Sequence, residues 1–121
     1  MKKKCGRKSH LYPIPSTLIG TLVDGKPNFA AVANIGILNH SEPQYFSIGV
    51  AHGHHTNLGI VQNRSFSINL INPSVALKAD YCGSVSGKVI DKSQLFKVFF
   101  GELGTAPLAE ECPLNIECKL Y

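Results

Sequence analysis

Residues 51–70 have the sequence AHGHHTNLGIVQNRSFSINL, and they are the most informative part of the chain. The first half predicts a polar loop that delivers Thr56 to the start of a short helix over about 56–62, ending near Asn63. The second half predicts a strand from Ser65 to Leu70, because Phe66, Ile68 and Leu70 alternate with small polar residues. This stretch therefore predicts a loop, a short helix and a strand in close succession.

The start of the predicted helix is a candidate anion site. Free backbone N–H groups and the helix dipole favour a negative charge there. The preceding loop carries three histidines, His52, His54 and His55, and no acidic residue. We expect the Thr56 hydroxyl to cap the helix and to contact a phosphate at the same time.

Further strands are predicted on both sides of this stretch. Apolar or alternating runs cover Thr17–Val23, Asn28–Gly36, Gln44–Val50 and Leu114–Tyr121. Asp24-Gly25 predicts a hairpin between the first two runs, with Lys26-Pro27 lengthening the connection. Two further short helices are expected around 74–80 and 92–97. The pattern favours a mainly β fold, an antiparallel sheet closed or nearly closed into a barrel with two or three short helices.

The last alternating run reaches the final residue, Tyr121, without a cap, a turn or a polar tail. We therefore expect the sheet partners of this run to be missing or to come from another subunit. An unpaired final strand favours association.

The composition bounds the class of protein. A chain of 121 residues with 44% hydrophobic residues forms a single domain, 1–121. Five of its twelve basic residues lie within residues 1–11, which we expect to form a flexible basic tail, and the balanced remainder argues against nucleic-acid binding. No apolar run approaches the ~20 residues that a membrane span needs. The four cysteines form no C-x-x-C pair, and we expect a cytoplasmic protein with reduced thiols.

Three clusters invite chemical interpretation. The histidines at 52, 54 and 55 resemble a metal site, but neighbouring side chains diverge and a further ligand is lacking, so no metal is expected. The turn around Cys82 offers Ser86 and Lys88 as donors, and a plain flexible turn explains it equally well. The segment Ala31-Val32-Ala33-Asn34 has side chains small enough to admit a flat ring, and close packing between elements is the alternative.

Taken in order, these segments resemble the flavin reductase-like family of FMN-binding split barrels, which includes the flavoredoxins. The resemblance rests on Tyr12-Pro13-Ile14-Pro15, Asp24-Gly25-Lys26-Pro27-Asn28, Glu42-Pro43, His54-His55-Thr56-Asn57 with the strand at 65–70, and Cys82-Gly83-x-x-Ser86-Gly87-x-x-x-Asp91-Lys92 followed by Leu95-Phe96 and Ala106-Pro107. Family members continue beyond the Glu117-Cys118-Lys119 segment, so the chain is expected to be a shortened form whose barrel is incomplete at the C-terminus.

The resemblance implies a homodimeric Greek-key barrel with one FMN per subunit. Carried over by position, Ala31, Val32, Ala33 and Asn34 face the isoalloxazine ring. The phosphate is held by the loop and helix start, namely Val50, Ala51, His52, His54, His55, Thr56 and Asn57. Ser86 and Lys88 lie near the ribityl chain or a neighbouring subunit.

The implied function is that of an FMN-binding oxidoreductase that takes electrons from NAD(P)H or a protein donor. No catalytic side chain is expected, because the flavin carries the chemistry. The chain lacks G-x-G-x-x-G, so any NAD(P)H is expected to bind transiently on the flavin face and not in a Rossmann domain. Two alternatives remain: an FMN-binding electron carrier without NAD(P)H turnover, and a flavin-free remnant that acts as an interaction protein.

Overall fold

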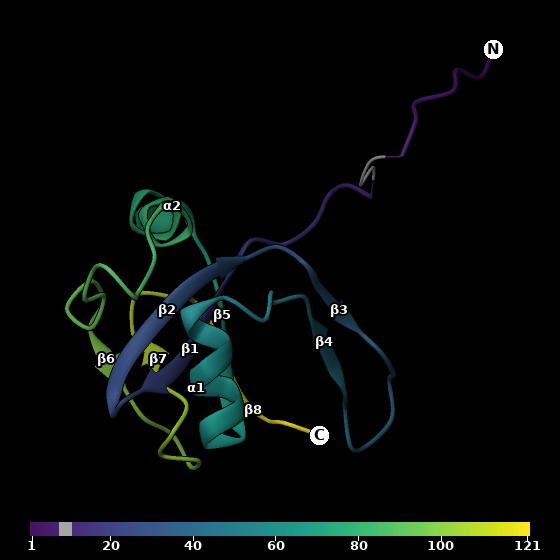
Figure 1. Cartoon of the computed structure of the whole chain (residues 1–121). Coiled ribbons are helices and arrows are strands. Elements are labelled where there is room, and N and C mark those ends of the chain that lie inside the picture. The colour runs from purple at the N-terminus through teal and green to yellow at the C-terminus, as the bar shows by residue number, and fades with distance from the viewer. Residues whose placement is uncertain (8–10) are drawn as a thin grey trace.

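A four-stranded antiparallel sheet forms the centre of the computed structural model, which describes residues 1–7 and 11–121. Its strands, in spatial order, are β2 (Lys26–Val32), β1 (Thr17–Val23), β5 (Ser65–Leu70) and β8 (Leu114–Lys119). Figure 1 shows this sheet with helix α1 (His55–Asn63) alongside it. The predicted strand over 65–70 is confirmed at both ends.

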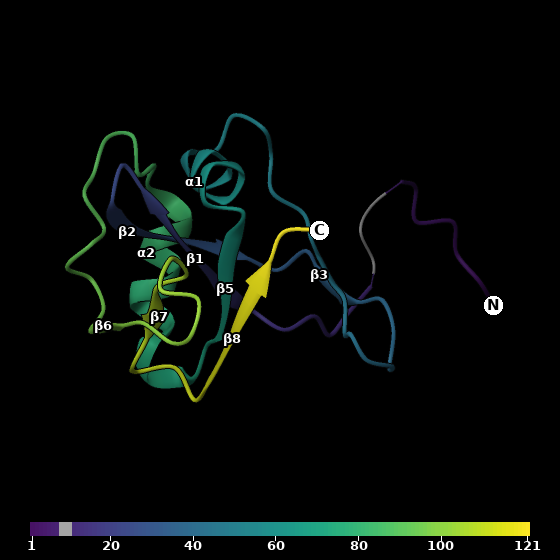
Figure 2. The same ribbon diagram turned by 90° about the horizontal axis from the view of Figure 1, so that it is seen from below.

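Smaller elements surround the central sheet. One hairpin pairs β3 (Ile35–Ile37) with β4 (Phe46–Ile48), and a second two-stranded sheet pairs β6 (Val98–Phe99) with β7 (Leu108–Ala109). A 3₁₀ turn, η1 (Pro73–Val75), leads into helix α2 (Ala76–Ser84). In Figures 1 and 2 the β3–β4 hairpin extends to one side of the central sheet, and α2 lies with β6 and β7 on the other.

The hairpin between β1 and β2 is tighter than the sequence predicts. Val23 pairs directly with Lys26, so Asp24 and Gly25 alone make the turn, and Lys26 and Pro27 belong to β2. Both turn residues have positive φ angles, 50° and 76°. These angles match the I′ class of turn, whose twist suits two antiparallel strands. The predicted lengthened connection is therefore wrong.

The core consists of two apolar clusters that share β1. Leu18 belongs to a cluster with Phe29, residues of α2 and the chain near Phe96, and the next residue, Ile19, belongs to a cluster with Ile60, Phe66 and Ile68. Successive strand residues point to opposite faces, so β1 must be apolar on both. This explains why Thr17–Val23 is a continuous apolar run rather than an alternating one.

Strand β5 is buried on its polar face as well. Asn69 is fully buried, and its amide donates to the Leu18 carbonyl at 3.0 Å and accepts from the Ala109 N–H at 3.1 Å. The Asn115 amide also donates to the Asn69 side-chain oxygen, at 2.7 Å. The segment around β7 therefore covers this face, and its hydrogen bonds satisfy the polar groups that it buries.

Helix α1 packs closely on the backbone of β1. A Cβ added to Gly59 would collide with the Leu22 carbonyl and with the Thr21 side chain. The Asn63 amide donates to that same carbonyl at 2.7 Å, which fixes the C-terminal end of the helix. The small residue in mid-helix thus permits a close approach that positions the start of α1 against the sheet.

Several predicted elements differ from the observed ones. The run 28–36 divides into β2 and β3, and residues 92–97 form turns instead of a helix. The Ser93 N–H donates to the Asp91 carboxylate at 2.8 Å and the Leu95 N–H to the Lys92 carbonyl at 3.2 Å, which are the bonds of tight turns and not of an α-helix. The sequence did not predict β6 or β7, two residues each.

The predictions for the last strand and for a closed barrel are also corrected by the structure. Strand β8 ends at Lys119 and pairs with β5 from Ser65 to Leu70, so the final run has a sheet partner within the chain. In the part of the chain that the structure describes, the strands form three separate antiparallel sheets and no closed barrel. A mainly β, antiparallel fold with short helices is confirmed. Of the predicted tail, residues 8–10 lie outside the described residues, and 1–7 are exposed and form no helix or strand.

Candidate functional site

The start of helix α1 has no side chain that caps it. His54 occupies the N-cap position in an extended conformation, it makes no side-chain cap hydrogen bond, and the first turn contains no acidic residue. Backbone N–H groups at such a terminus need an outside acceptor, and the helix dipole favours an anionic one. The terminus is therefore chemically suited to an anion.

Thr56 lies inside the helix and does not cap it. It is the second helical residue and is buried, and its Oγ1 accepts a hydrogen bond from Asn28 Nδ2 at 2.9 Å. The capping prediction is wrong because the chain enters the helix one residue earlier than the predicted start at Thr56. Within the described residues the Thr56 hydroxyl donates no hydrogen bond, so its proton is available to another acceptor. Asn28, on β2, was not predicted, because nothing in the sequence marks it as buried against Thr56.

A hollow of about 270 Å³ opens beside this helix start. Its walls come from β2, the loop before α1, the end of α2 and the turn that follows α2. Six predicted site residues line it: Ala31, His54, His55, Thr56, Ser86 and Lys88. Segments far apart in the sequence, predicted on separate grounds, thus meet at one place.

The other predicted residues lie outside the lining of this hollow. Val32 and Val50 pack against the cluster around Ile19, and Ala33 and Asn34 are exposed between β2 and β3. The remaining three shape the loop and the first turn: the Ala51 carbonyl accepts from the His54 N–H at 3.0 Å, His52 is exposed in a turn, and the Asn57 N–H donates to the His54 carbonyl at 3.0 Å.

Lys92 brings a buried positive charge to the hollow. Its side chain is only 4% exposed, and Nζ donates to the Cys82 carbonyl at 2.8 Å and to the Phe29 carbonyl at 3.3 Å. No carboxylate pairs with it among the described residues. Burial lowers the pKa of this ammonium, and the Cys82 thiol partly opposes that shift. A buried charge held only by neutral groups favours an anionic partner.

His55 contributes an unpartnered polar atom. Its Nδ1 is buried and has no hydrogen-bond partner within residues 1–7 and 11–121. A buried polar atom of this kind is uncommon in folded proteins and marks a place where a ligand or a water is expected. Together with the uncapped helix and Lys92, it fits a phosphate-bearing group.

Ser86 and Lys88 lie on the turn beyond α2. Ser86 Oγ accepts from the Lys88 N–H at 3.2 Å, and Lys88 Nζ donates to the Gly53 carbonyl at 2.9 Å. The ammonium of Lys88 therefore bridges the turn and the loop before α1, on the rim of the hollow.

The thiols and histidines form no metal cluster in the described part of the chain. All four cysteines are free thiols. Burial raises the pKa of Cys82 and nearby Lys92 lowers it less, so at neutral pH this residue is a protonated thiol and a poor nucleophile. Within the same residues, no helix is long and apolar enough to cross a membrane.

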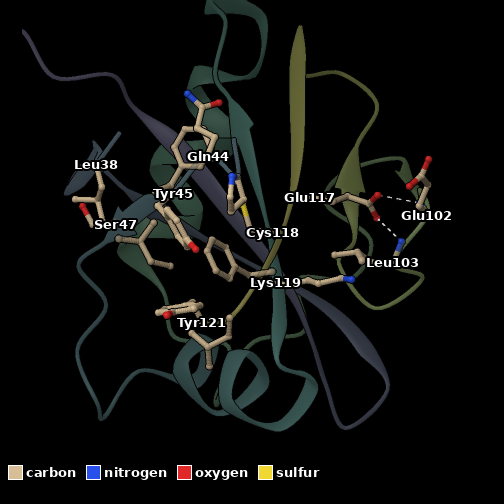
Figure 3. Close-up of a pocket in the computed structure, with 15 residues that line it drawn as sticks. Leu38, Gln44, Tyr45, Ser47, Glu102, Leu103, Glu117, Cys118, Lys119 and Tyr121 are labelled. Atoms are coloured by element: carbon tan, nitrogen blue, oxygen red, sulfur yellow. Dashed lines mark hydrogen bonds between the residues drawn. The ribbon is translucent and has the colours of Figure 1, made fainter. Parts of the chain in front are cut away.

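A larger hollow, of about 930 Å³, lies between the β3–β4 hairpin and β8, as Figure 3 shows. Tyr45 and Tyr121 pack edge to face there, 5.3 Å apart. Its one glutamate on β8, Glu117, already accepts from the N–H groups of Glu102 and Leu103 at 2.8 and 3.1 Å. The sequence did not predict this hollow, and none of the predicted site residues lines it.

The comparisons with known proteins agree with the geometry. The model of the family described as "Flavin reductase like domain" matches residues 9–121. A comparison with curated protein sequences gives no match.

Solved structures extend this result. A flavoredoxin from Methanosarcina acetivorans is 44% identical with a TM-score of 0.93, and the match covers 98% of this chain and 63% of that one. Flavoredoxin of Desulfovibrio vulgaris (Miyazaki F) is 34% identical with a TM-score of 0.91, over 100% of this chain and 67% of that one. An FMN-binding protein from Thermus thermophilus is 23% identical with a TM-score of 0.87, and the match covers 100% of this chain and 67% of that one. At this identity the match supports the fold alone.

The chain therefore spans about two thirds of the length of these relatives, 63% for the first. The resemblance predicted from the ordered motifs is confirmed by the family match and by two flavoredoxins at more than 30% identity. The chain belongs to the flavin reductase-like family.

Proposed function

We propose that this chain binds FMN, with the phosphate at the start of helix α1. The observation that carries the proposal is the convergence on one hollow of an uncapped helix terminus, the buried Lys92 ammonium and the unpartnered Nδ1 of His55. The helix terminus and the ammonium favour an anion, the histidine nitrogen leaves room for a further polar contact, and no acidic side chain lines the hollow.

The size of the hollow indicates which part of the cofactor it takes. About 270 Å³ is below the roughly 300–1,000 Å³ typical of sites that enclose a whole ligand. We infer that the phosphate and part of the ribityl chain enter it. The ring then lies outside, along the exposed side chains of Ala31 and Ala33 and the amide of Asn34, with Val32 contributing only its backbone.

The chain's own residues then have separate tasks. Bound FMN would supply the electron transfer, by accepting and passing on a hydride or single electrons. Thr56 donates its hydroxyl proton toward the phosphate while Asn28 donates to the Thr56 oxygen, and the ammonium of Lys92 balances the phosphate charge. We propose an oxidoreductase of the flavoredoxin type, with NAD(P)H or a redox protein as the electron donor.

The test is a titration of the protein with FMN, followed by flavin fluorescence and by the melting temperature. At ~100-fold over the dissociation constant, a folded-state ligand adds roughly 2.7 kcal/mol, which a melting curve detects. Riboflavin, which lacks the phosphate, serves as the matched ligand and is expected to bind more weakly. Unchanged melting with saturating FMN contradicts the proposal and favours a flavin-free interaction protein.

A second measurement separates the enzyme from the electron carrier. NADH and NADPH are added anaerobically to the FMN-loaded protein, and the flavin absorbance is recorded. Bleaching supports turnover with a nicotinamide donor. A protein that stays yellow with both supports an electron carrier served by a protein donor.

We also propose that the separate sheets are parts of a split barrel and that the protein is a homodimer, as the family resemblance implies. The β3–β4 hairpin and β8 border the same 930 Å³ hollow, which supports an arrangement of both around one interior. Light scattering coupled to size exclusion gives the mass in solution, and a monomer at all concentrations contradicts the dimer.

A further inference from the structure

We propose that the turn Ser86–Ile90 is a latch that closes over the hollow beside α1 and controls the release of a bound flavin. This inference rests on the proposed function. Lys88 is the residue that holds the latch shut, by its hydrogen bond to the Gly53 carbonyl at 2.9 Å. It acts as a positioning residue of the site, through the loop before α1.

The turn is built to move as one unit. The Ser86 carbonyl accepts from the N–H groups of Val89 and Ile90 at 3.0 and 3.1 Å, and the Ser86 hydroxyl accepts from the Lys88 N–H at 3.2 Å. These bonds lie within the turn and survive its displacement. Val89, at the tip, is 82% exposed and anchors nothing.

The ends of the turn are fixed more firmly than the turn itself. Before it, α2 ends at Ser84, with Cys82 buried in the core. After it, Lys92 is buried and bonded to two carbonyls. The segment 85–91 therefore spans two fixed points, and in Figure 1 it leads from α2 toward β6.

The closed position depends on a missing side chain. A Cβ on Gly87 would collide with Asn28 Oδ1 and would lie 2.7 Å from His55 Cδ2. The backbone of Gly87 therefore sits directly against the two side chains that flank Thr56. A second hollow, of about 330 Å³, lies against the same turn and shares His55, Gly87, Lys88 and Lys92 with the first. The turn is thus the wall between two hollows, and its displacement joins them.

The outer contacts of the turn are weak ones. The bond from Lys88 to Gly53 lies at the surface, and Lys26 and Asp91 approach only to 4.0 Å with both side chains largely exposed. Exposed ion pairs and single surface hydrogen bonds contribute little to stability. The closed and open positions are therefore close in free energy, as a latch requires.

The experiment compares the wild-type protein with Lys88→Met and measures the dissociation rates of FMN and of riboflavin by stopped-flow fluorescence. Loss of one hydrogen bond corresponds to roughly a twofold to tenfold faster release. Because the latch acts through Gly53, we expect the same factor for both flavins. Lys119→Met, which removes the same charge from an exposed residue at the end of β8, is the control and keeps both rates.

A second variant and a ligand-free measurement complete the test. Gly87→Ala should release both flavins faster as well, since its methyl group prevents closure. In the ligand-free protein, Lys88→Met should increase amide hydrogen exchange across residues 51–55 and leave β5 unchanged.

Three results overturn the latch. An effect of Lys88→Met on FMN alone makes Lys88 a phosphate ligand, and unchanged rates for both flavins remove its role. These two outcomes leave the proposed function intact. A wild-type protein that binds neither flavin removes the proposed function and the latch together.

Discussion

At the scale of single residues, the hydrogen bond between Asn28 and Thr56 joins the site to the fold. Both residues are buried, and the bond links β2 to the first turn of α1. Thr56→Val keeps the shape and removes the acceptor, so Asn28 Nδ2 is left buried without a partner. The free energy of unfolding should fall by about 1–3 kcal/mol, and FMN should bind more weakly.

Thr56→Ser is the matched control, because it restores the hydroxyl. Urea denaturation gives the stability and flavin fluorescence the affinity of each variant. Stability and affinity both equal to those of the wild type in Thr56→Val would contradict the assignment. A loss of stability with unchanged affinity would limit Thr56 to a structural role.

Sequence reasoning found only some of the residues at the site. His54, His55 and Thr56 could be predicted because a polar loop before a helix marks a helix terminus locally. Lys92 and Asn28 could not, because their importance comes from burial against residues far away in the chain. The predicted residues Ala33 and Asn34 lie outside the hollow, because β2 ends at Val32 and these two residues are exposed in the connection to β3.

At the scale of elements, β5 shows that a sequence pattern can predict a strand without predicting which segments cover its faces. The alternation over 65–70 predicted the strand, with apolar side chains on one face and small polar ones on the other. In the structure Ser65, Ser67 and Asn69 are buried under the segment around β7. Two-residue strands such as β7 carry too little pattern to be predicted, so the cover on β5 was not foreseen.

That cover depends on Asn69. Asn69→Leu leaves the Ala109 N–H and the Leu18 carbonyl without their side-chain partner, and it should lower the free energy of unfolding by about 3 kcal/mol. Chemical denaturation measures this, and Asn39→Leu, at a half-buried loop residue whose amide bonds lie mostly at the surface, is a control with a smaller effect. Equal losses in the two variants would contradict the role of the buried network.

The contact between α1 and β1 gives a second prediction for an element. Gly59→Ala forces a methyl group against the Leu22 carbonyl and must shift the helix, which should destabilise the protein by about 1–3 kcal/mol. The shift moves the start of α1, so affinity for FMN should fall as well. Gly53→Ala adds the same atom where nothing lies within 4 Å, and a loss of stability as large as that of Gly59→Ala would contradict the argument.

At the scale of the whole molecule, the site lies where independently stabilised parts meet. The cluster around Leu18 holds β2 and α2, and the cluster around Ile19 holds α1 and β5. The hollow opens between α1, β2 and the end of α2, so both clusters must form before its walls are in place. The order of the longer strands and of α1 and α2 could be predicted from the sequence, but not the strands β6 and β7. Their arrangement into separate sheets could not, since it depends on contacts between distant segments.

The two clusters also contain buried or half-buried thiols. The free energy of unfolding of the whole molecule is therefore expected to change with pH in the alkaline range. Burial raises the pKa of Cys112, in the first cluster, and of Cys118, beside the second, from 9.0 to about 11. Between these values the unfolded chain loses protons that the folded chain keeps. Stability is therefore complete below pH 9 and falls as the pH rises through about 11.

Urea denaturation from pH 7 to pH 11 should show this fall, and a Cys112→Ala, Cys118→Ala double variant should lose less over the same interval. Cys5→Ala, at an exposed thiol, should follow the wild-type curve. Lys92 has the opposite effect on the pH dependence, because its lowered pKa means that the unfolded chain binds more protons at this residue than the folded chain does. Lys92 is present in the wild type and in all these variants, so its effect is common to every curve. A double variant whose stability falls as steeply as that of the wild type would mean that the two clusters do not exclude water from their thiols.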